Sequence, residues 1–333
     1  MKVRILVIRG GALGDFIVTL PALALLRKTW PGAQIEILGK PSIACLAVGR
    51  HYADNCRSIE DPAFAPFYLP GVELPPSEAA YFSSFHLVVS WLSDPELVFQ
   101  HNLQRCGLEP LEHGISPAEI GRKTPGYYLR GDSRIVASPA AAQLCAPLAL
   151  LGLSTSDYRS RVYPNSEDRA EASRLLPDDG RRTVAIHPGS GSPRKNWPFE
   201  NWKELMERMS EELDVRLVLT GGEAESELLP QLSSGLKVPH TVIYNQTLPV
   251  CAAVLERCNF FLGHDSGISH LAAAVGIPCQ LLFGVTDPDV WAPPGAHVKI
   301  TRSVKGMESI SVDEVLNRLQ RRFLQRDCEE REE

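Results

Sequence analysis

The hydrophobic positions of the chain form short apolar runs, each followed by a glycine-rich loop and a segment with helical spacing. The apolar run 3–9 precedes the loop Gly10–Asp15, and an apolar helical stretch extends from Phe16 to Lys28. After the turn at Pro31-Gly32, the stretch 34–39 has the composition of a second strand. This order predicts a βαβ unit, in which a helix joins two parallel strands.

The same order returns in the second half of the chain. A strand at 183–187 is followed by a loop at 188–192, a helix at about 200–212 and a strand at 215–220. Four further strands are predicted, at 87–91, 242–244, 260–262 and 280–283. Alternating strands and helices favour parallel sheets with helices on both faces. Because the pattern restarts midway, the sequence predicts two such domains.

A polar stretch from Tyr158 to Arg182 marks the boundary, and it holds a short predicted helix around 166–176. We expect an N-terminal domain over 1–165, a second domain over 180–310 and a C-terminal helix within 311–333. That helix has apolar residues at helical spacing, and whether it packs back on the N-terminal domain is left open.

Composition narrows the class of protein. The chain has 333 residues, a net charge of -6 and an apolar share of 44%. These are globular values, and the lack of a basic excess argues against nucleic-acid binding. No apolar run reaches the ~18–20 residues of a membrane span. The eight cysteines are scattered without a CxxC pair, so we expect reduced thiols, no metal site and a cytoplasmic protein.

The first candidate loop is Gly10–Asp15. A dinucleotide-binding GxGxxG motif would need glycine at position 9, where Arg9 stands, and Gly39-Lys40 replaces the expected acidic residue. A nicotinamide enzyme is therefore disfavoured. Asp15 opens the following helix, where a carboxylate interacts favourably with the helix dipole. That structural role and a catalytic one both remain open for it.

The second candidate loop is 187–198. Its small residues expose backbone N–H groups, its serines add hydroxyl donors, and Arg194 and Lys195 add positive charge. These are the parts of a phosphate cradle, although the P-loop motif GxxxxGK[ST] is absent. The alternative is a flexible loop with solvated charges.

Two further loops follow predicted strands. The N–H groups at Ser266 and Gly267 would open a helix, which favours anions, and His270 lies one turn further on. Asp265 is either the N-cap of that helix or sets the loop against a ligand. In Gly221–Glu227, a carboxylate could accept a ribose hydroxyl or be a solvated helix start. The Asp287-Pro288-Asp289 triplet is interpreted as a turn rather than a metal motif.

Taken together, these loops resemble glycosyltransferase family 9, the ADP-heptose:lipopolysaccharide heptosyltransferases. The matching segments are 11–23, 187–198, 220–227 and 263–293. The resemblance implies an α/β protein of the GT-B fold, with two Rossmann-like doubly wound domains facing a cleft. It also implies an inverting, metal-independent glycosyltransferase without a cofactor, which moves a heptose from ADP-heptose to a hydroxyl of a lipopolysaccharide core or other glycan acceptor.

The resemblance also assigns roles to residues. Asp15 matches the catalytic base, and Lys195 matches the lysine that contacts the donor phosphates. The implied donor-binding residues are Gly14, Ser190, Gly191, Lys195, Glu225, Asp265, Ser266, Gly267 and His270. Glu223 competes with Glu225 for the ribose contact. Basic residues of the first domain are candidates for an anionic acceptor, namely Arg9, Lys40, Arg50, Arg122 and Lys123.

The chain departs from the family at two places. Val18 stands where the family often has a histidine shortly after the aspartate, and the stretch 85–100 does not match the usual acceptor region. Donor sugar and acceptor therefore stay open. The alternatives are a transferase of the same fold with another nucleotide sugar or a protein acceptor, and a non-catalytic nucleotide-sugar-binding protein. We expect no nucleic-acid partner, a cytoplasmic location and peripheral contact with the inner membrane as an option.

Overall fold

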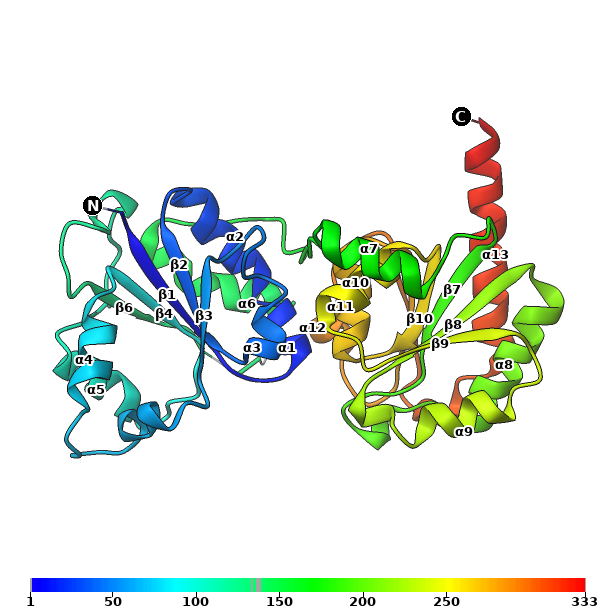
Figure 1. Cartoon of the computed structure of the whole chain (residues 1–333), viewed down its shortest axis with the longest axis horizontal. Helices are drawn as coiled ribbons and strands as arrows, with labels where there is room; N and C mark the ends of the chain where they lie inside the picture. The colour runs from blue at the N-terminus through cyan, green and yellow to red at the C-terminus, as the bar shows by residue number, and fades with distance from the viewer. Residues whose placement is uncertain (1, 133, 136–138, 333) are drawn as a thin grey trace. The chain divides into compact units, whose positions relative to one another are not determined.

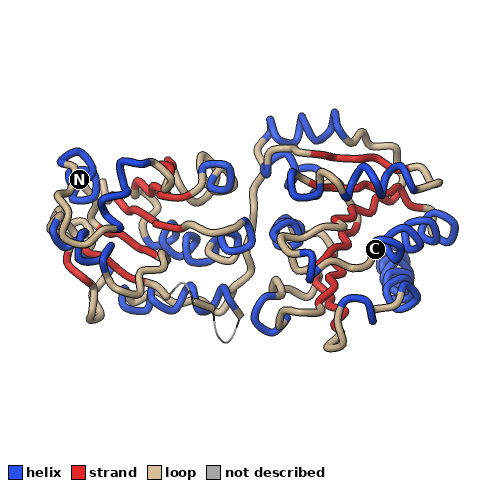
Figure 2. Tube along the Cα trace, turned by 90° about the horizontal axis from the view of Figure 1, so that it is seen from below, coloured by secondary structure: helices blue, strands red, loops and turns tan. Residues whose placement is uncertain are grey.

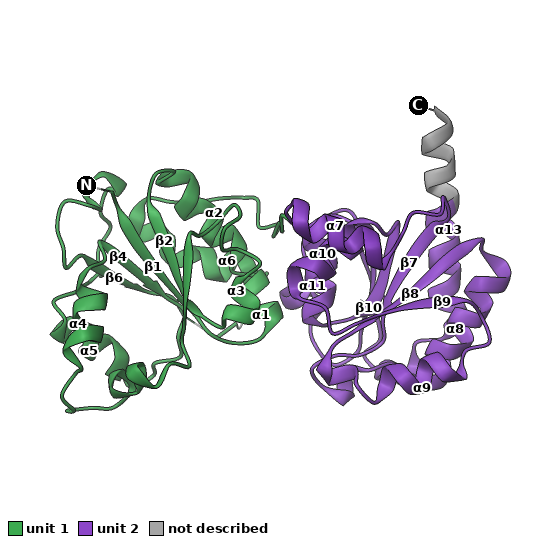
Figure 3. Ribbon diagram, in the orientation of Figure 1, with its two compact units in different colours: residues 1–163 green, residues 164–333 purple. Residues whose placement is uncertain are grey.

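A computed structural model describes residues 2–132, 134–135 and 139–332 of the chain. The chain divides into two compact units, residues 1–163 and 164–333 (Figure 3). Each unit is built around a six-stranded parallel sheet, and helices cover both faces of each sheet (Figures 1 and 2). The α/β class and the two-domain plan predicted from the restarting pattern are confirmed.

The sheet of the first unit has the strand order β3-β2-β1-β4-β6-β5. Its strands are β1 (Arg4–Arg9), β2 (Gln34–Gly39), β3 (Asn55–Ser58), β4 (Leu87–Ser90), β5 (Glu109–Pro110) and β6 (Tyr127–Arg130). The register pairs Ile8 with Ser90, and Ser90 with Arg130. Because all strands run parallel, Arg9 and Arg130 end at the same, carboxyl edge of this sheet.

Short helices connect these strands or follow the last of them. They are α1 (Leu13–Ile17), α2 (Leu20–Thr29), α3 (Pro41–Ala44), η1 (Pro62–Tyr68), α4 (Pro76–Ser83), α5 (Val98–Arg105), η2 (Pro117–Glu119), α6 (Ala140–Cys145) and η3 (Ala146–Leu151). The single helix predicted over 16–28 is two helices. Pro21 has no N–H to donate to the Ile17 carbonyl, which instead accepts the Ser160 hydroxyl at 2.7 Å.

The second unit repeats the plan with the strand order β12-β11-β10-β7-β8-β9. Its strands are β7 (Arg182–His187), β8 (Val215–Gly221), β9 (His240–Tyr244), β10 (Phe260–His264), β11 (Cys279–Phe283) and β12 (Val298–Arg302). Its helices are α7 (Ser166–Leu175), η4 (Pro193–Lys195), α8 (Phe199–Glu212), η5 (Glu223–Glu225), α9 (Leu228–Gly235), α10 (Leu248–Glu256), α11 (Gly267–Val275), α12 (Pro288–Trp291), η6 (Met307–Ser309) and α13 (Val312–Glu332).

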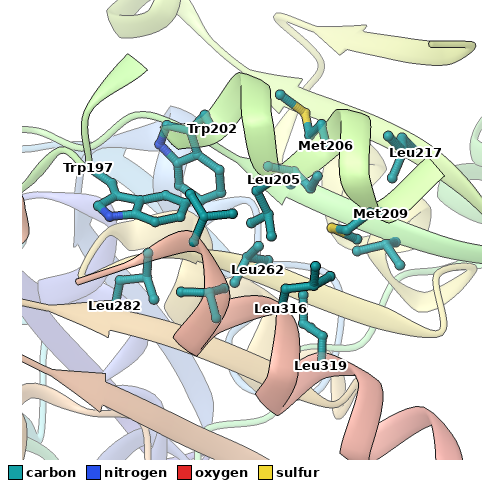
Figure 4. Packing of buried hydrophobic residues seen from close by; sticks show 14 of the residues in the cluster. Trp197, Trp202, Leu205, Met206, Met209, Leu217, Leu262, Leu282, Leu316 and Leu319 are labelled. Carbon is teal, nitrogen blue, oxygen red and sulfur yellow. The ribbon is translucent and has the colours of Figure 1, made fainter. Parts of the chain in front are cut away.

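One hydrophobic core of the second unit lies between its sheet and helices α8 and α13 (Figure 4). Helix α8 buries Trp202, Leu205, Met206 and Met209, which share one face at helical spacing. Helix α13 contributes buried residues to the same cluster, namely Val312, Val315, Leu316, Leu319 and Phe323. Residues 312–323 therefore pack on the second unit, whereas the sequence had left packing on the N-terminal domain open.

The attachment of α13 generates a prediction about stability. Leu319→Ala should reduce the free energy of unfolding by about 2–5 kcal/mol, because it removes a fully buried side chain and leaves a cavity. Arg321→Ala, at an exposed position of the same helix, is the matched control and should change it by less than about 0.5 kcal/mol. Urea denaturation followed by tryptophan fluorescence measures both, and equal effects would contradict the packing described.

Candidate catalytic and donor sites

Asp15 lies in the first turn of α1, directly after the glycine loop that follows β1. Its Oδ2 accepts the backbone N–H of Ala12 at 3.0 Å, and its side chain is 35% exposed. Gly11 has φ +95°, and a Cβ there would stand 2.8 Å from Oδ2. One carboxylate oxygen of Asp15 thus serves the structural role predicted for it in the first turn of α1. The carboxylate nevertheless remains accessible to solvent.

Arg9 lies behind this carboxylate rather than in solvent. It is 5% exposed, and its Nε and Nη2 donate to the backbone carbonyl of Asp15 at 3.1 and 2.9 Å. Burial lowers the pKa of Arg9, while the charge of Asp15 acts in the opposite direction. The expectation that Arg9 meets an acceptor directly therefore conflicts with its burial.

The other predicted acceptor residues lie at different places. Lys40 follows β2 at the carboxyl edge, and its Nζ is 3.4 Å from Glu60 Oε1. The Arg50 guanidinium donates to the Cys45 and Val48 carbonyls. Arg122 and Lys123 precede β6, whose first residue is level with Leu87 at the start of β4. They therefore lie at the amino edge, opposite the edge that carries the Asp15 loop.

A basic residue that the sequence analysis missed lies at the carboxyl edge. Arg130 ends β6 and lines a hollow of about 290 Å³ together with Leu92–Pro95, Gly131, Asp132 and Arg134. Its Nη1 donates to the Asp94 carbonyl at 3.3 Å, while the Asp94 carboxylate accepts backbone N–H groups of Phe99 and Gln100. Among the described residues, the Arg130 guanidinium forms no ion pair. The nearby Asp132 carboxylate, whose pKa is lowered first by the Arg134 backbone N–H and also by the Arg130 charge, pairs with Arg134 instead, so Arg130 can meet an anion.

In the second unit, Lys195 and Asp265 form an ion pair. Lys195 Nζ lies 2.7 Å from Asp265 Oδ2, and the Thr286 hydroxyl donates to the same oxygen at 2.7 Å. Asp265 is 8% exposed and is not the N-cap of α11, because Ser266 holds that position and its Oγ accepts the N–H of Ser269. Asp265 thus joins Lys195 and Thr286 instead of capping α11, and its role in setting the loop against a ligand stays a prediction.

His264 was not singled out from the sequence, although it organises the loop after β7. Its Nε2 accepts the backbone N–H of Trp197 at 2.8 Å, and its Nδ1 lies 3.4 Å from the Gly189 carbonyl. Complete burial lowers the pKa of His264 to about 3, so the ring is neutral. The only clue in the sequence was its place at the end of a strand.

The loop after β7 is held by its own polar groups as well. The Ser190 hydroxyl lies 2.8 Å from the Ser192 carbonyl and 2.7 Å from Asn196 Oδ1. At Gly191, a Cβ would meet no atom within 4 Å, so the backbone there stands open to a ligand. These hydrogen bonds give the loop a defined conformation, while Arg194 is exposed to solvent as the alternative expected.

Glu225 rather than Glu223 faces that loop. Glu225 is 5% exposed, its Oε2 accepts the Gly222 N–H at 2.9 Å, and Glu223 is exposed. Its Oε1 lies 3.8 Å from His187 Nε2. Burial lowers the pKa of His187, and its Nδ1 lies 2.9 Å from the Thr220 carbonyl. The neutral ring therefore donates from Nδ1 and leaves Nε2 toward Glu225.

The predicted donor residues gather at one edge of the second sheet. The order β10-β7-β8 makes these strands neighbours, so the loops after them meet at their carboxyl ends. These loops carry Ser190, Gly191, Lys195, Glu225, Asp265, Ser266 and Gly267, and His270 is buried in the first turn of α11. Gly14 is the exception, because it lies in α1 of the first unit.

Comparison with known proteins agrees with this arrangement. The sequence profile of glycosyltransferase family 9 (heptosyltransferase) matches residues 140–317. The chain belongs to this family. Lipopolysaccharide heptosyltransferase 1 of Pseudomonas aeruginosa is 37% identical over 112 residues, which are 33% of this chain and 31% of that family member. The curated relatives that match first are thus aligned over only about a third to two fifths of their length.

Solved structures of the family share the whole fold. A family 9 glycosyl transferase from Veillonella parvula superposes with a TM-score of 0.76 at 20% identity, covering 94% of this chain and 95% of its own. E. coli ADP-heptose lipopolysaccharide heptosyltransferase II superposes with a TM-score of 0.74 at 16% identity, covering 98% of this chain and 100% of its own. These likenesses establish the GT-B fold expected from the family 9 resemblance.

The described residues contain neither a metal-binding cluster nor a membrane-spanning helix. No group of three or more His, Cys, Asp or Glu side chains is arranged to hold a metal ion among them. In the same part of the chain, no helix has the length and apolar character to span a membrane.

The neutral state of His264 predicts a pH dependence of stability. Its folded pKa of about 3 lies below the ordinary value of 6.5, so at intermediate pH the unfolded chain binds a proton that the folded chain does not. Stability is therefore lost as the pH falls from about 6.5 to about 3, with a slope of up to about 1.4 kcal/mol per pH unit.

His264→Gln should reduce this slope by up to one proton, because the amide oxygen can accept the Trp197 N–H without titrating. Urea denaturation at several pH values between about 4 and 6 measures the slope. His187 is present in both proteins, so the difference between the two slopes reports on the replacement of His264. Identical slopes for the two proteins would refute the assignment of a neutral His264.

Proposed function

We propose that the protein is an inverting glycosyltransferase that moves a heptose from ADP-heptose to a hydroxyl of a lipopolysaccharide core acceptor. One observation carries the proposal: Lys195, Glu225 and Asp265 gather at one sheet edge, within the region that matches the family. The substrate class is supported by the relatives, which include lipopolysaccharide heptosyltransferases and structures with ADP or an ADP-heptose analogue. A cytoplasmic location and contact with the inner membrane stay predictions.

The second unit supplies the donor groups in this proposal. Lys195 is 31% exposed and paired with Asp265, so a pyrophosphate would compete for its ammonium group. The open backbone at Gly191 and the amide groups at the start of α11 would add hydrogen bonds to the phosphate oxygens. Glu225 keeps one oxygen, Oε1, for a ribose hydroxyl, because Oε2 already accepts the Gly222 N–H.

The chemistry divides between the two units. The acceptor hydroxyl attacks the anomeric carbon of the donor while Asp15 takes its proton as general base. The bond to the diphosphate breaks on the opposite face, and therefore the configuration inverts. Lys195 stabilises the negative charge that develops on the leaving group. Independence of metal is part of the proposal, and unchanged transfer after treatment with EDTA is its test.

The proposal predicts different effects for two substitutions. Asp15→Ala should lower kcat by at least about a hundredfold and leave ADP affinity within about twofold, because it removes only the general base. Lys195→Ala should weaken ADP binding by about tenfold or more, since it removes a charge-assisted contact. Transfer assays and calorimetric titration with ADP measure these effects. Normal transfer by Asp15→Ala, or ADP affinity lost in that variant, would contradict the assignment.

The hollow at Arg130 predicts where an anionic acceptor binds. Arg130→Ala should raise the acceptor KM by about tenfold, the effect of one lost charge-assisted hydrogen bond, while the donor KM stays unchanged. Lys123→Ala is the matched control, because Lys123 lies at the opposite edge and pairs with Glu109. Steady-state kinetics with lipopolysaccharide core acceptor measures both, and a larger effect of Lys123→Ala would overturn this placement.

A further inference from the structure

We infer that Arg9 is a positioning residue for Asp15, holding the turn that carries the carboxylate. The inference rests on the proposed role of Asp15 as general base. Arg9 ends the central strand β1 and is 5% exposed. Its Nε and Nη2 both donate to the Asp15 carbonyl, at 3.1 and 2.9 Å, and Nη2 lies 3.8 Å from the carboxylate oxygen Oδ1.

The Asp15 carbonyl needs these donors because α1 ends early. In an uninterrupted helix this carbonyl would accept the N–H of Thr19, but that N–H donates to the Phe16 carbonyl instead. The Thr19 hydroxyl, at 2.8 Å, and the Arg9 guanidinium replace it. A buried carbonyl without a partner would cost free energy, so the helix break and the buried arginine belong together.

The shape of the guanidinium suits this task. Its Nη1 also reaches the Trp91 carbonyl at the end of β4, at 3.5 Å. One planar group thereby links the ends of β1 and β4 to the backbone of the residue that bears the carboxylate. A lysine would bring the charge but not the fork of donors. The same charge, 3.8 Å from Oδ1, attracts the carboxylate from the buried side and leaves its exposed side for the acceptor.

This role differs in its kinetics from the contact with the acceptor that the sequence suggested. A positioning residue affects the chemical step, so its loss lowers kcat. A residue that binds the acceptor affects the acceptor KM when it is removed. Binding of ADP depends on residues of the second unit and should be unchanged in either case.

The test uses the full-length protein with the substitutions Arg9→Gln and Arg9→Lys. We expect Arg9→Gln to lower kcat by about tenfold or more. Its acceptor KM and its ADP affinity should stay within about twofold of the wild-type values. Arg9→Lys should recover part of kcat, because it restores the charge alone. Thr19→Val removes the other side-chain donor to the same carbonyl and should also lower kcat, which provides a second variant if Arg9→Gln does not fold.

The matched control is Arg27→Gln. Arg27 is 15% exposed and likewise donates to backbone carbonyls of the first unit, at Tyr52 and Ala33, but does not contact Asp15. Arg27→Gln should lower the thermal stability as Arg9→Gln does, but its kcat should stay within about twofold of the wild-type value.

An increase in acceptor KM at constant kcat in Arg9→Gln would identify an acceptor contact and overturn the inference. Unchanged kinetics in Arg9→Gln and Thr19→Val, with Asp15→Ala inactive, would also overturn it and leave the proposed function standing. An equal loss of kcat in Arg27→Gln would show that Arg9→Gln acts through general destabilisation and would overturn the inference. Normal transfer by Asp15→Ala would instead refute the proposed base itself.

Discussion

The parallel pairing of β10, β7 and β8 is the constraint on which the candidate donor site depends. Parallel neighbours end at the same edge, so loops that lie far apart in the sequence meet there. Lys195 follows β7 and Asp265 follows β10, yet their charged groups are 2.7 Å apart. Without this strand order, the residues that match the family motifs would have no common location.

The polar groups at this edge already have protein partners. Lys195 pairs with Asp265, Glu225 accepts a backbone N–H, and His264 joins the loop after β7 to the end of β10. Burying such groups without partners would be costly. The partners hold the loops in place. In the proposed function, binding of a phosphate would therefore exchange one ionic contact of Lys195 for another instead of ordering a mobile loop. This is the kind of preorganisation that electrostatic stabilisation of a leaving group requires.

The sequence predicted the elements whose signals are local. Apolar runs followed by glycines identified β1 and β7, and the spacing in 200–212 identified α8. The strand β6 was missed because Tyr127–Arg130 is short and has none of the β-branched Val or Ile residues that identified β1 and β4. Because β6 was not predicted, the sequence could not tell that Arg130 lies at the carboxyl edge and that Arg122 and Lys123 lie at the amino edge. The partners of Asp265 and His264 depend on tertiary contacts that no local pattern encodes.

Arg9 and Arg130 show how topology separates the roles of identical residues. Each is the last residue of a parallel strand in the same sheet, and only β4 lies between the two strands. β1 is central, and α1 follows its end closely, so the Arg9 guanidinium is buried against backbone carbonyls. β6 lies nearer the sheet edge, and Arg130 remains exposed beside a hollow. A buried guanidinium orients the chain around it, whereas an exposed one can bind an anion. Strand order, and not the distribution of charge along the sequence, therefore decides which arginine can serve the acceptor.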